Sequence, residues 1–131
     1  MNDRLKELLR IVGLEHDQDL MPEELSGGMH RRVAIARSLA ALEPKMFLYD
    51  EPTAGLDPVN AEMICKLILD LCEAGRGFVI VTHKVFDALK VAARILFLKR
   101  GRIIFDGERE NLLKDPSPEI QAFLGELRFD G

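Results

Sequence analysis

The chain of 131 residues has little of what marks secreted, membrane-spanning or nucleic-acid-binding proteins. It contains two cysteines, no tryptophan and one tyrosine, and its formal net charge is −4. This acidic balance gives no electrostatic reason to expect nucleic acid as a main partner. No apolar run approaches the roughly 20 residues that a transmembrane helix needs. Nothing near the N-terminus is similar to a signal peptide, so we expect a cytoplasmic protein.

The two cysteines, Cys65 and Cys72, fall on one predicted helix. Their spacing separates them by about 10 Å along the helix axis, which is too far for a disulfide bond. No histidine lies near either cysteine at the spacing of a zinc site. We therefore expect both to be reduced core residues.

A phosphate-binding loop is also missing from the sequence. None of its 10 glycines opens the pattern Gly-x-x-x-x-Gly-Lys-[Ser/Thr]. Such a loop supplies the backbone N–H groups and the lysine that hold the β- and γ-phosphates of a nucleotide. If this chain takes part in nucleotide chemistry, the N–H groups and the lysine that hold the phosphates must come from another source.

What is present is an alternation of helical and strand patterns, which predicts one α/β domain with a single core. Buried parallel strands are expected at residues 46–49 and 78–81, and an antiparallel hairpin at residues 94–105, turning at Arg100 and Gly101. Helices are predicted over residues 4–12, 26–42, 58–72, 85–93, 109–114 and 118–124.

The first stretch with chemical potential is a serine followed by two glycines at a predicted helix start, within residues 25–29 (Leu-Ser-Gly-Gly-Met). Unpaired backbone N–H groups and the positive end of the helix dipole suit an anion such as phosphate there. Alternatively, Ser26 only caps the helix and the glycines ease the turn. From this stretch alone the two interpretations have about equal weight.

Two adjacent carboxylates, Asp50 and Glu51, follow the first predicted strand. Open α/β sheets bind ligands at the carboxyl ends of their strands. At that edge, Asp50 would hold the water shell of a magnesium ion, and Glu51 would orient or deprotonate an attacking water. The alternative is a solvated acidic turn, which is common for one acid and less common for two.

The second predicted strand is followed by Thr82 and His83. Both strands should end at the same sheet edge, so we expect His83 near Glu51, where it could donate a hydrogen bond to a γ-phosphate. Taken alone, a histidine at this position is more often a structural residue. The other two histidines, His16 and His30, have no such context and are expected on the surface.

Taken together, these motifs resemble those of ATP-binding-cassette (ABC) ATPases, in the order and spacing of that family. Residues 25–37 resemble the signature and its helix, and residues 49–58 (Tyr-Asp-Glu-Pro-Thr-Ala-Gly-Leu-Asp-Pro) resemble the Walker B segment and D-loop. Thr82 with His83 resembles the switch histidine. The resemblance covers essentially the whole chain, with Met29 in place of the usual glutamine.

The same residues also suggest a subfamily. Met29, the Walker B run and the ending at residues 120–125 (Ile-Gln-Ala-Phe-Leu-Gly) resemble the ATPases of the Mla type. Those proteins drive phospholipid trafficking and are linked to organic-solvent resistance.

The resemblance implies a partial P-loop NTPase fold. Residues 1–43 would be the end of the helical subdomain with the signature helix, and residues 44–131 the second half of the catalytic core. The family's phosphate loop, Q-loop and adenine-stacking aromatic lie upstream of the signature. This sequence lacks them, so the resemblance implies a truncated or incomplete ATP-binding protein.

The resemblance also implies roles for single residues, with ATP and Mg²⁺ as cofactors. Glu51 and His83 would be catalytic, Asp50 would bind Mg²⁺ through water, and Asp57 would act in the D-loop. In the family, two subunits enclose two nucleotides, and each signature meets the nucleotide that the other subunit holds. The residues that would act in trans in this way are Ser26, Gly27, Gly28 and Met29.

The implied function is that of an ABC transporter ATP-binding subunit, coupling ATP binding and hydrolysis to transport, with phospholipid as the substrate class suggested by the Mla resemblance. Its partners would be another ABC ATPase subunit and a membrane permease, at the inner face of the cell membrane. Without a phosphate loop, we expect no ATP hydrolysis by this chain alone.

Two other hypotheses stay open. The first is a non-catalytic partner that binds a complete ABC ATPase or transporter subunit. Nucleotide affinity separates it from an ATPase, because tight MgATP binding by the chain alone would favour the ATPase. A DNA-repair or chromosome-structuring ATPase is weakly supported, since the sequence has no coiled-coil heptads.

The family's strand order predicts unpaired sheet edges in this chain. The strand that leads into the phosphate loop would lie between residues 78–81 and 95–98, and it is missing here. Exposed strand edges invite pairing with another chain. We therefore expect these strand edges to pair either within the chain, in a rearranged sheet, or with a second copy of the chain. We favour the second copy, as a dimer with two-fold symmetry.

Overall fold

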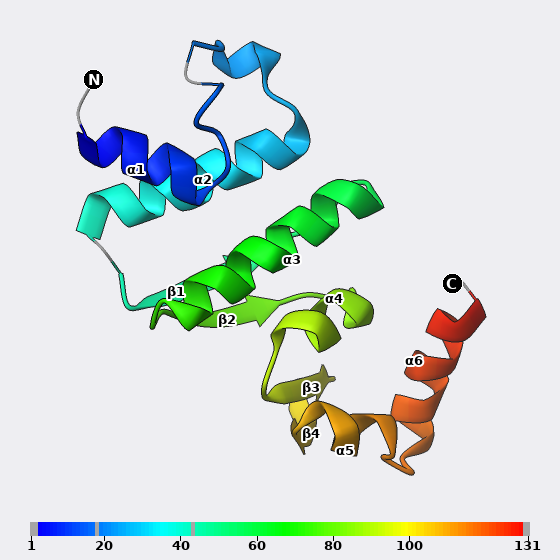
Figure 1. Cartoon of the computed structure of the whole chain (residues 1–131). Coiled ribbons are helices and arrows are strands. Elements are labelled where there is room, and N and C mark those ends of the chain that lie inside the picture. Colours follow the sequence, from blue (N-terminus) through cyan, green and yellow to red (C-terminus); the bar gives the residue numbers. More distant parts are fainter. Residues whose placement is uncertain (1–2, 18, 43, 130–131) are drawn as a thin grey trace. The chain divides into compact units, whose positions relative to one another are not determined.

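The computed structural model describes residues 3–17, 19–42 and 44–129, and it forms two compact units, one ending at Thr82 and one beginning at His83. The elements follow the predicted alternation of helices and strands (Figure 1). In the first unit they are α1 (Asp3–Ile11), η1 (Pro22–Glu24), α2 (Gly27–Leu42), β1 (Met46–Asp50), α3 (Pro58–Glu73) and β2 (Gly77–Val81). In the second they are α4 (Val85–Val91), β3 (Ile95–Lys99), β4 (Arg102–Gly107), α5 (Arg109–Leu113) and α6 (Pro118–Phe129).

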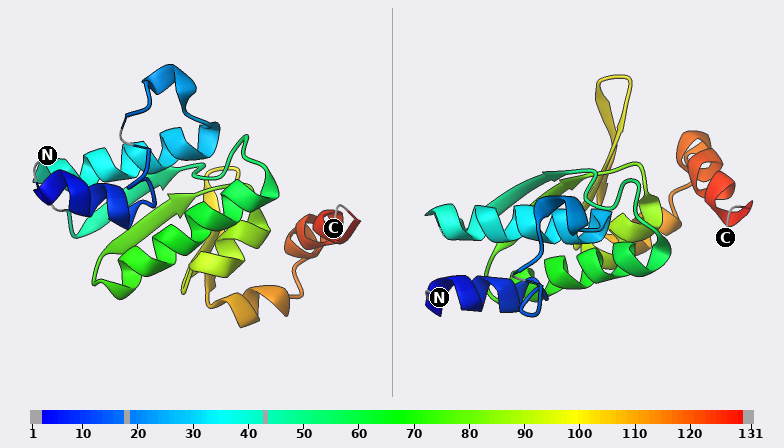
Figure 2. Two further views of the ribbon diagram at one scale, coloured as in Figure 1. Left: turned by 45° about the horizontal axis from the view of Figure 1, so that its top comes forward. Right: turned by 90° about the horizontal axis from the view of Figure 1, so that it is seen from above.

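The first unit is built on a parallel pair of strands covered by helices on one face. β1 and β2 pair in register, with Met46 opposite Gly77 and Asp50 opposite Val81. α3 connects them as the crossover helix that a parallel pair requires. Both α2 and α3 lie on the same side of the two strands, and α1 packs beside α2 (Figure 2).

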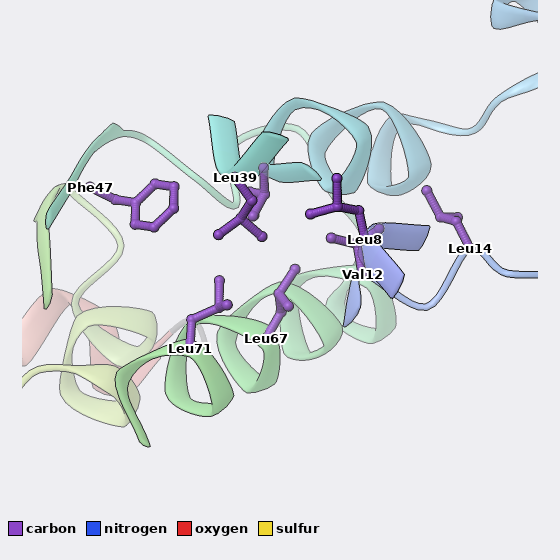
Figure 3. Packing of buried hydrophobic residues seen from close by; sticks show 8 residues of the cluster. Leu8, Val12, Leu14, Leu39, Phe47, Leu67 and Leu71 are labelled. Atoms are coloured by element: carbon purple, nitrogen blue, oxygen red, sulfur yellow. The ribbon is translucent and has the colours of Figure 1, made fainter. Parts of the chain in front are cut away.

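The core of this unit lies between those helices and the covered face of the strands. Leu39 of α2 is fully buried, and Leu67 and Leu71 of α3 point toward it (Figure 3). Phe47 of β1 closes one end of the cluster and stacks on Phe78 of β2 with ring centroids 4.9 Å apart. The other buried members are Leu8, Val12, Leu14 and Ile35.

The expected burial of both strands holds on one face only. Met46, Leu48, Val79 and Val81, whose side chains alternate with the covered ones, are between 50% and 80% exposed. Successive side chains of a strand point to opposite faces, and the described helices of the unit cover only one of them. The apolar composition of a strand therefore shows that its side chains favour burial. It does not show which elements pack against each face of the strand.

The second unit has its own smaller core beneath an antiparallel hairpin. β3 and β4 pair from Ile95 opposite Gly107 to Lys99 opposite Arg102, as predicted. Arg100 and Gly101 both have positive φ, at 50° and 74°, which is the conformation of the two-residue turns that match strand twist. One hairpin face packs with α4 against the buried residues Leu112, Ile120 and Leu124.

The predicted helix starts are confirmed by their caps. Ser26 Oγ accepts a hydrogen bond from the backbone N–H of Met29 at 3.2 Å, at the start of α2. Asp57 Oδ1 accepts one from the backbone N–H of Asn60 at 2.8 Å, with Pro58 in the first turn of α3. α6 runs to Phe129 rather than ending before Gly125, because one glycine costs a helix only about 1 kcal/mol.

The cysteine prediction is half right. The two cysteines form no disulfide with each other, and Cys65 is buried on α3. Cys72 is exposed, because it lies in the last turn of the helix beyond the residues that pack inward. His16 and His30 are exposed, as expected.

The described strands form two separate two-stranded sheets, so the rearranged single sheet is not found among them. The dimer, which was the preferred alternative, stays a prediction. So does the subdomain boundary near residue 43, which lies outside the described residues. None of the described helices has both the length and the apolar character to span a bilayer.

Candidate functional site

The acid pair lies at the carboxyl end of the parallel strands, as predicted. Asp50 ends β1 with an exposed side chain, and Glu51 follows it with a φ of 49°, in the left-handed region that non-glycine residues seldom adopt. The backbone N–H of Glu51 donates to Val81 O at 2.7 Å. Thr82 Oγ1 donates to Glu51 Oε2 at 2.9 Å, so the ends of both strands hold this carboxylate.

A third contact to the same turn comes from α2. Arg31 Nη1 donates to the carbonyl oxygens of Glu51 at 2.8 Å and Pro52 at 2.7 Å, and its Nη2 donates to Ala54 O at 2.6 Å. The guanidinium is therefore bonded along one side of the turn that follows β1. These are charge-assisted bonds in a half-buried place, which makes them stronger than neutral surface contacts.

The signature residues occupy the start of α2 with different exposures. Ser26 and Gly27 are exposed, whereas Gly28 is in close contact with α3 and Met29 packs against the first unit's core. A Cβ atom at Gly28 would lie 2.7 Å from Asn60 Oδ1, so this glycine allows the close approach of α2 to α3. Ser26 and Gly27 are thus the signature residues that an anion could reach.

Asn60 connects this contact to the D-loop. Its Nδ2 donates to Asp57 Oδ2 at 2.7 Å, while its backbone N–H donates to the other carboxylate oxygen. These two hydrogen bonds, the backbone one first, lower the pKa of Asp57 below its ordinary value. The carboxylate of Asp57 therefore stays charged through the neutral range as the cap of α3.

Tyr49 lies on the covered face, one residue before the acid pair. Burial raises the pKa of its phenol, and the positive charge of Arg31 partly opposes that rise. The phenol is therefore neutral at physiological pH, and Arg31 supplies positive charge beside the strand end.

The residues at this edge fit a magnesium ion that is held mainly by phosphate and water. Among the described residues, no group of three or more histidine, cysteine or acidic side chains forms a protein cage for a metal. Mg²⁺ with a nucleotide needs only one or two carboxylates, because phosphates and waters complete its octahedron. Asp50 offers one exposed carboxylate at the strand end for that purpose.

The structure brings most of the predicted site residues into the first unit, but not all of them. Asp50, Glu51 and Asp57 lie on segments that α2 contacts directly through Arg31 and Gly28. His83 is the first residue of the second unit, directly after Thr82, and its expected proximity to Glu51 stays a prediction.

Sequence reasoning missed the contacts of Arg31, Thr82 and Asn60. Arg31 is one of several arginines on the signature helix, and nothing in the sequence separates it from Arg32 or Arg37. The sequence marks Thr82 only as the neighbour of His83. The positive φ of Glu51 has no sequence signal, because such strain comes from surrounding structure.

Comparisons with known proteins agree with this geometry. Residues 1–54 match the family model described as "ABC transporter". The glutamine transport ATP-binding protein GlnQ of Escherichia coli (strain K12) is 49% identical over 120 residues, which are 91% of this chain and 50% of GlnQ. The arginine transport ATP-binding protein ArtM of Bacillus subtilis (strain 168) is 40% identical over 126 residues, which are 95% of this chain and 52% of ArtM.

The fold is shared with solved structures as well. MJ1267, an ATP-binding cassette of an ABC transporter in its ADP conformation, superposes with a TM-score of 0.81 and 31% identity over 92% of this chain and 48% of that one. The chain thus spans about half the length of the relatives it matches. This chain has the α/β P-loop NTPase fold of these ATP-binding cassettes, and its sequence is similar to about half of an ABC transporter ATP-binding protein.

Proposed function

We propose that this chain acts as the part of an ABC transporter ATP-binding subunit that carries the signature, the acid pair and the D-loop, and that it couples ATP binding and hydrolysis to transport. The observation that carries the proposal is the position of Glu51. Its carboxylate lies at the end of two parallel strands, where Thr82 bonds it and Arg31 bonds its backbone. Open α/β sheets place their ligands at this edge.

In this proposal Glu51 orients an attacking water and accepts its proton, while the Thr82 hydroxyl fixes the carboxylate. Asp50 holds Mg²⁺ through water, and the ion neutralises charge on the phosphates when it is bound. His83 donates a hydrogen bond to the γ-phosphate. Asp57 caps α3 and holds the D-loop that precedes this helix.

The signature acts on a nucleotide that a second ATP-binding subunit holds. Ser26 and Gly27 are exposed at the start of α2, where backbone N–H groups and the helix dipole favour a phosphate. Gly28 and Met29 are less exposed, because Gly28 lies against Asn60 and Met29 packs against the core of the first unit.

ATP turnover also needs a phosphate loop, and the sequence has none. Catalysis depends on phosphates that are fixed in line with the attacking water. We therefore expect the chain alone to hydrolyse no ATP, and the acid pair to work only with a phosphate loop supplied by other residues.

The substrate class we propose is a small polar amino acid or a similar solute. The two curated relatives described above are named for glutamine and arginine transport, and neither name mentions a lipid. The phospholipid class suggested by the Mla resemblance has no support from those names.

As partners we propose a second ABC ATPase subunit, identical or related, and a membrane permease, so that the assembled protein sits at the inner face of the cell membrane. The apolar face of β1 and β2 that the helices of the first unit leave uncovered supports association with further protein. A two-fold dimer of this chain is one such association.

A non-catalytic role is the second candidate, and the exposure of Ser26 and Gly27 at the start of α2 is the observation that favours it. In that role the chain would bind a complete ABC ATPase or transporter subunit and present Ser26 and Gly27 to its nucleotide. Tight MgATP binding by the chain alone would contradict this candidate.

A chimera tests the first candidate. The half of GlnQ that precedes its match to this chain would be joined to the full chain, so that a phosphate loop is present. We expect steady ATP hydrolysis, reduced by at least about 100-fold in Glu51→Gln, because a general base contributes about that much or more. A folded chimera that binds MgATP but turns over equally with and without Glu51 would overturn the proposal.

A mixing experiment tests the trans role of the signature. The chain would be added to complete GlnQ, and ATP hydrolysis would be measured for Ser26→Arg and His83→Ala variants of the chain. Only Ser26→Arg should change the turnover at the shared site, by its bulk and misplaced charge. Equal effects of the two substitutions would contradict a trans role.

A further inference from the structure

We propose that Arg31 is a positioning residue for Glu51, and that it joins the signature helix to the turn bearing the catalytic carboxylate. The inference rests on the proposed function for the catalytic role of Glu51. The positioning itself rests on the geometry of the first unit alone.

The contact is specific in its geometry. Two guanidinium nitrogens of Arg31 donate three hydrogen bonds of 2.6–2.8 Å to the carbonyls of Glu51, Pro52 and Ala54. Those carbonyls belong to one short turn, 20 to 23 residues away in sequence. A lysine ammonium is a compact point charge without a planar fork, so it cannot match this spread of acceptors.

The turn needs such a constraint. Glu51 has a φ of 49°, and strained residues of this kind persist only where the surrounding structure over-determines them. Its N–H is bonded to Val81 O and its carboxylate to Thr82, and both of those partners belong to the β2 end. Arg31 supplies a further constraint from α2, on the carbonyl.

The neighbouring arginines of α2 show that helix position alone does not produce this contact. Arg32 is buried, and its Nη1 lies 3.8 Å from Met63 Sδ on α3. Arg37 is exposed further along the helix. Arg31 is less than two helical turns from Ser26, so a shift of the signature end of α2 is transmitted to the carbonyl of Glu51.

Amide hydrogen exchange of the full chain tests the positioning without any nucleotide. The amides of Glu51 and Ala54 are bonded to Val81 O and Glu51 O, so they report on the turn. In Arg31→Met we expect their exchange to quicken by about tenfold, with Arg31→Lys intermediate. The amide of Ala61, bonded to Asp57 O in α3, serves as the internal reference.

Arg37→Met is the matched control, because it removes the same side chain from an exposed place on the same helix. It should leave the Glu51 and Ala54 amides unchanged. If Arg31→Met quickens Ala61 by the same factor, the arginine acts on general stability and the inference is overturned. The inference also fails if the turn amides do not respond to Arg31→Met.

ATP turnover of the GlnQ chimera tests the consequence for catalysis. We expect Arg31→Met to lower kcat by about tenfold with KM for MgATP unchanged, since a misplaced base weakens the chemical step rather than binding. The double variant with Glu51→Gln should be no slower than Glu51→Gln alone. A raised KM with unchanged kcat would overturn the inference.

The two arms separate the inference from the proposed function. If the unsubstituted chimera binds MgATP without hydrolysing it, the proposed function fails, and hydrogen exchange alone decides whether Arg31 holds the turn. If the chimera is active but Arg31→Met changes neither exchange nor kcat, the inference fails and the proposed function stands.

Discussion

The contacts that hold the Glu51 turn in the first unit and two ion pairs of the second unit lie in different surroundings. In the first unit, the bonds of Arg31 and Thr82 to the Glu51 turn are half-buried beside a core of eight buried apolar residues. In the second unit, the Arg94–Asp106 and Lys99–Glu119 pairs are exposed above a core of three. Nearly all the proposed site residues belong to the first unit, and His83 alone belongs to the second.

The difference indicates where a rigid site can be built. A hydrogen bond that is shielded from water is stronger and costs more to break, whereas an exposed ion pair is weakened by solvent and salt. Glu51 is held at an uncommon φ because its constraints lie on the shielded side of the first unit. In the hairpin of the second unit, the ion pairs are exposed and the pairing register shifts between Phe97 and Leu98.

Deleting core side chains is the strongest test of this comparison. Leu39 and Ile120 are both fully buried, one in each unit. We expect Leu39→Ala to lower the free energy of unfolding of the first unit by about 3–4 kcal/mol, and Ile120→Ala to lower that of the second by about 2 kcal/mol. The smaller core has fewer surrounding atoms, so it can collapse further around the cavity.

Native-state hydrogen exchange measures the two losses separately, on the amides of α3 and of the β3–β4 hairpin. Each substitution should quicken exchange mainly in its own unit. If Leu39→Ala quickens amide exchange equally in both units, the two units unfold together. Their stabilities could then not be compared separately.

A smaller effect is expected where α2 approaches α3. In Gly28→Ala, the new methyl group would lie 2.7 Å from Asn60 Oδ1 and 3.2 Å from Asn60 Cβ, so the two helices must shift. Overpacking costs about 1–3 kcal/mol, and the better helix propensity of alanine returns about 1 kcal/mol. We expect a net loss of about 1 kcal/mol in the free energy of unfolding.

Gly27→Ala is the matched control, since its methyl group would meet only Leu56 Cδ2, at 3.4 Å. It should be neutral or slightly stabilising in urea denaturation. If both glycines tolerate alanine equally, the close approach of the signature to Asn60 does not constrain this unit.

Much of this fold could be predicted from the sequence, because local signals were strong. The caps at Ser26 and Asp57 and the turn at Arg100 and Gly101 are short-range features whose chemistry is complete within a few residues. The parallel strands followed from apolar runs separated by a helix. Asp50 and Glu51 then fell at a strand end by topology alone.

The rest depends on contacts between distant residues. Arg31 bonds a turn 20 residues away, and an arginine on a helix surface has the same local pattern whether or not it makes such a contact. Burial was wrongly predicted for the face of Leu48 and Val81, because composition shows which side chains favour burial but not which elements cover them. The wrong prediction for Cys72 has the same cause.

The smallest effect is expected at the exposed Arg94–Asp106 pair of the second unit. Arg94 Nε and Nη2 donate to the two oxygens of Asp106, each at 2.7 Å, and these bonds lower the pKa of the Asp106 carboxyl below its ordinary value. Because the folded pKa is the lower one, the pair stabilises the fold above the unfolded pKa of about 3.9, and that contribution is lost as pH falls through the folded pKa.

Asp106→Asn should therefore lower Tm slightly at neutral pH and low salt, and the difference from the parent should vanish in acid or at about 1 M salt. The matched control, Glu119→Gln, removes the exposed Lys99–Glu119 pair and should behave alike. Thermal unfolding followed on the hairpin amides measures both. The comparison is contradicted if Asp106→Asn lowers Tm as much as Leu39→Ala does, or if the lower Tm persists at high salt. An exposed contact would then stabilise the second unit as strongly as a shielded contact stabilises the first. Burial would then not explain why the proposed site residues cluster where they do.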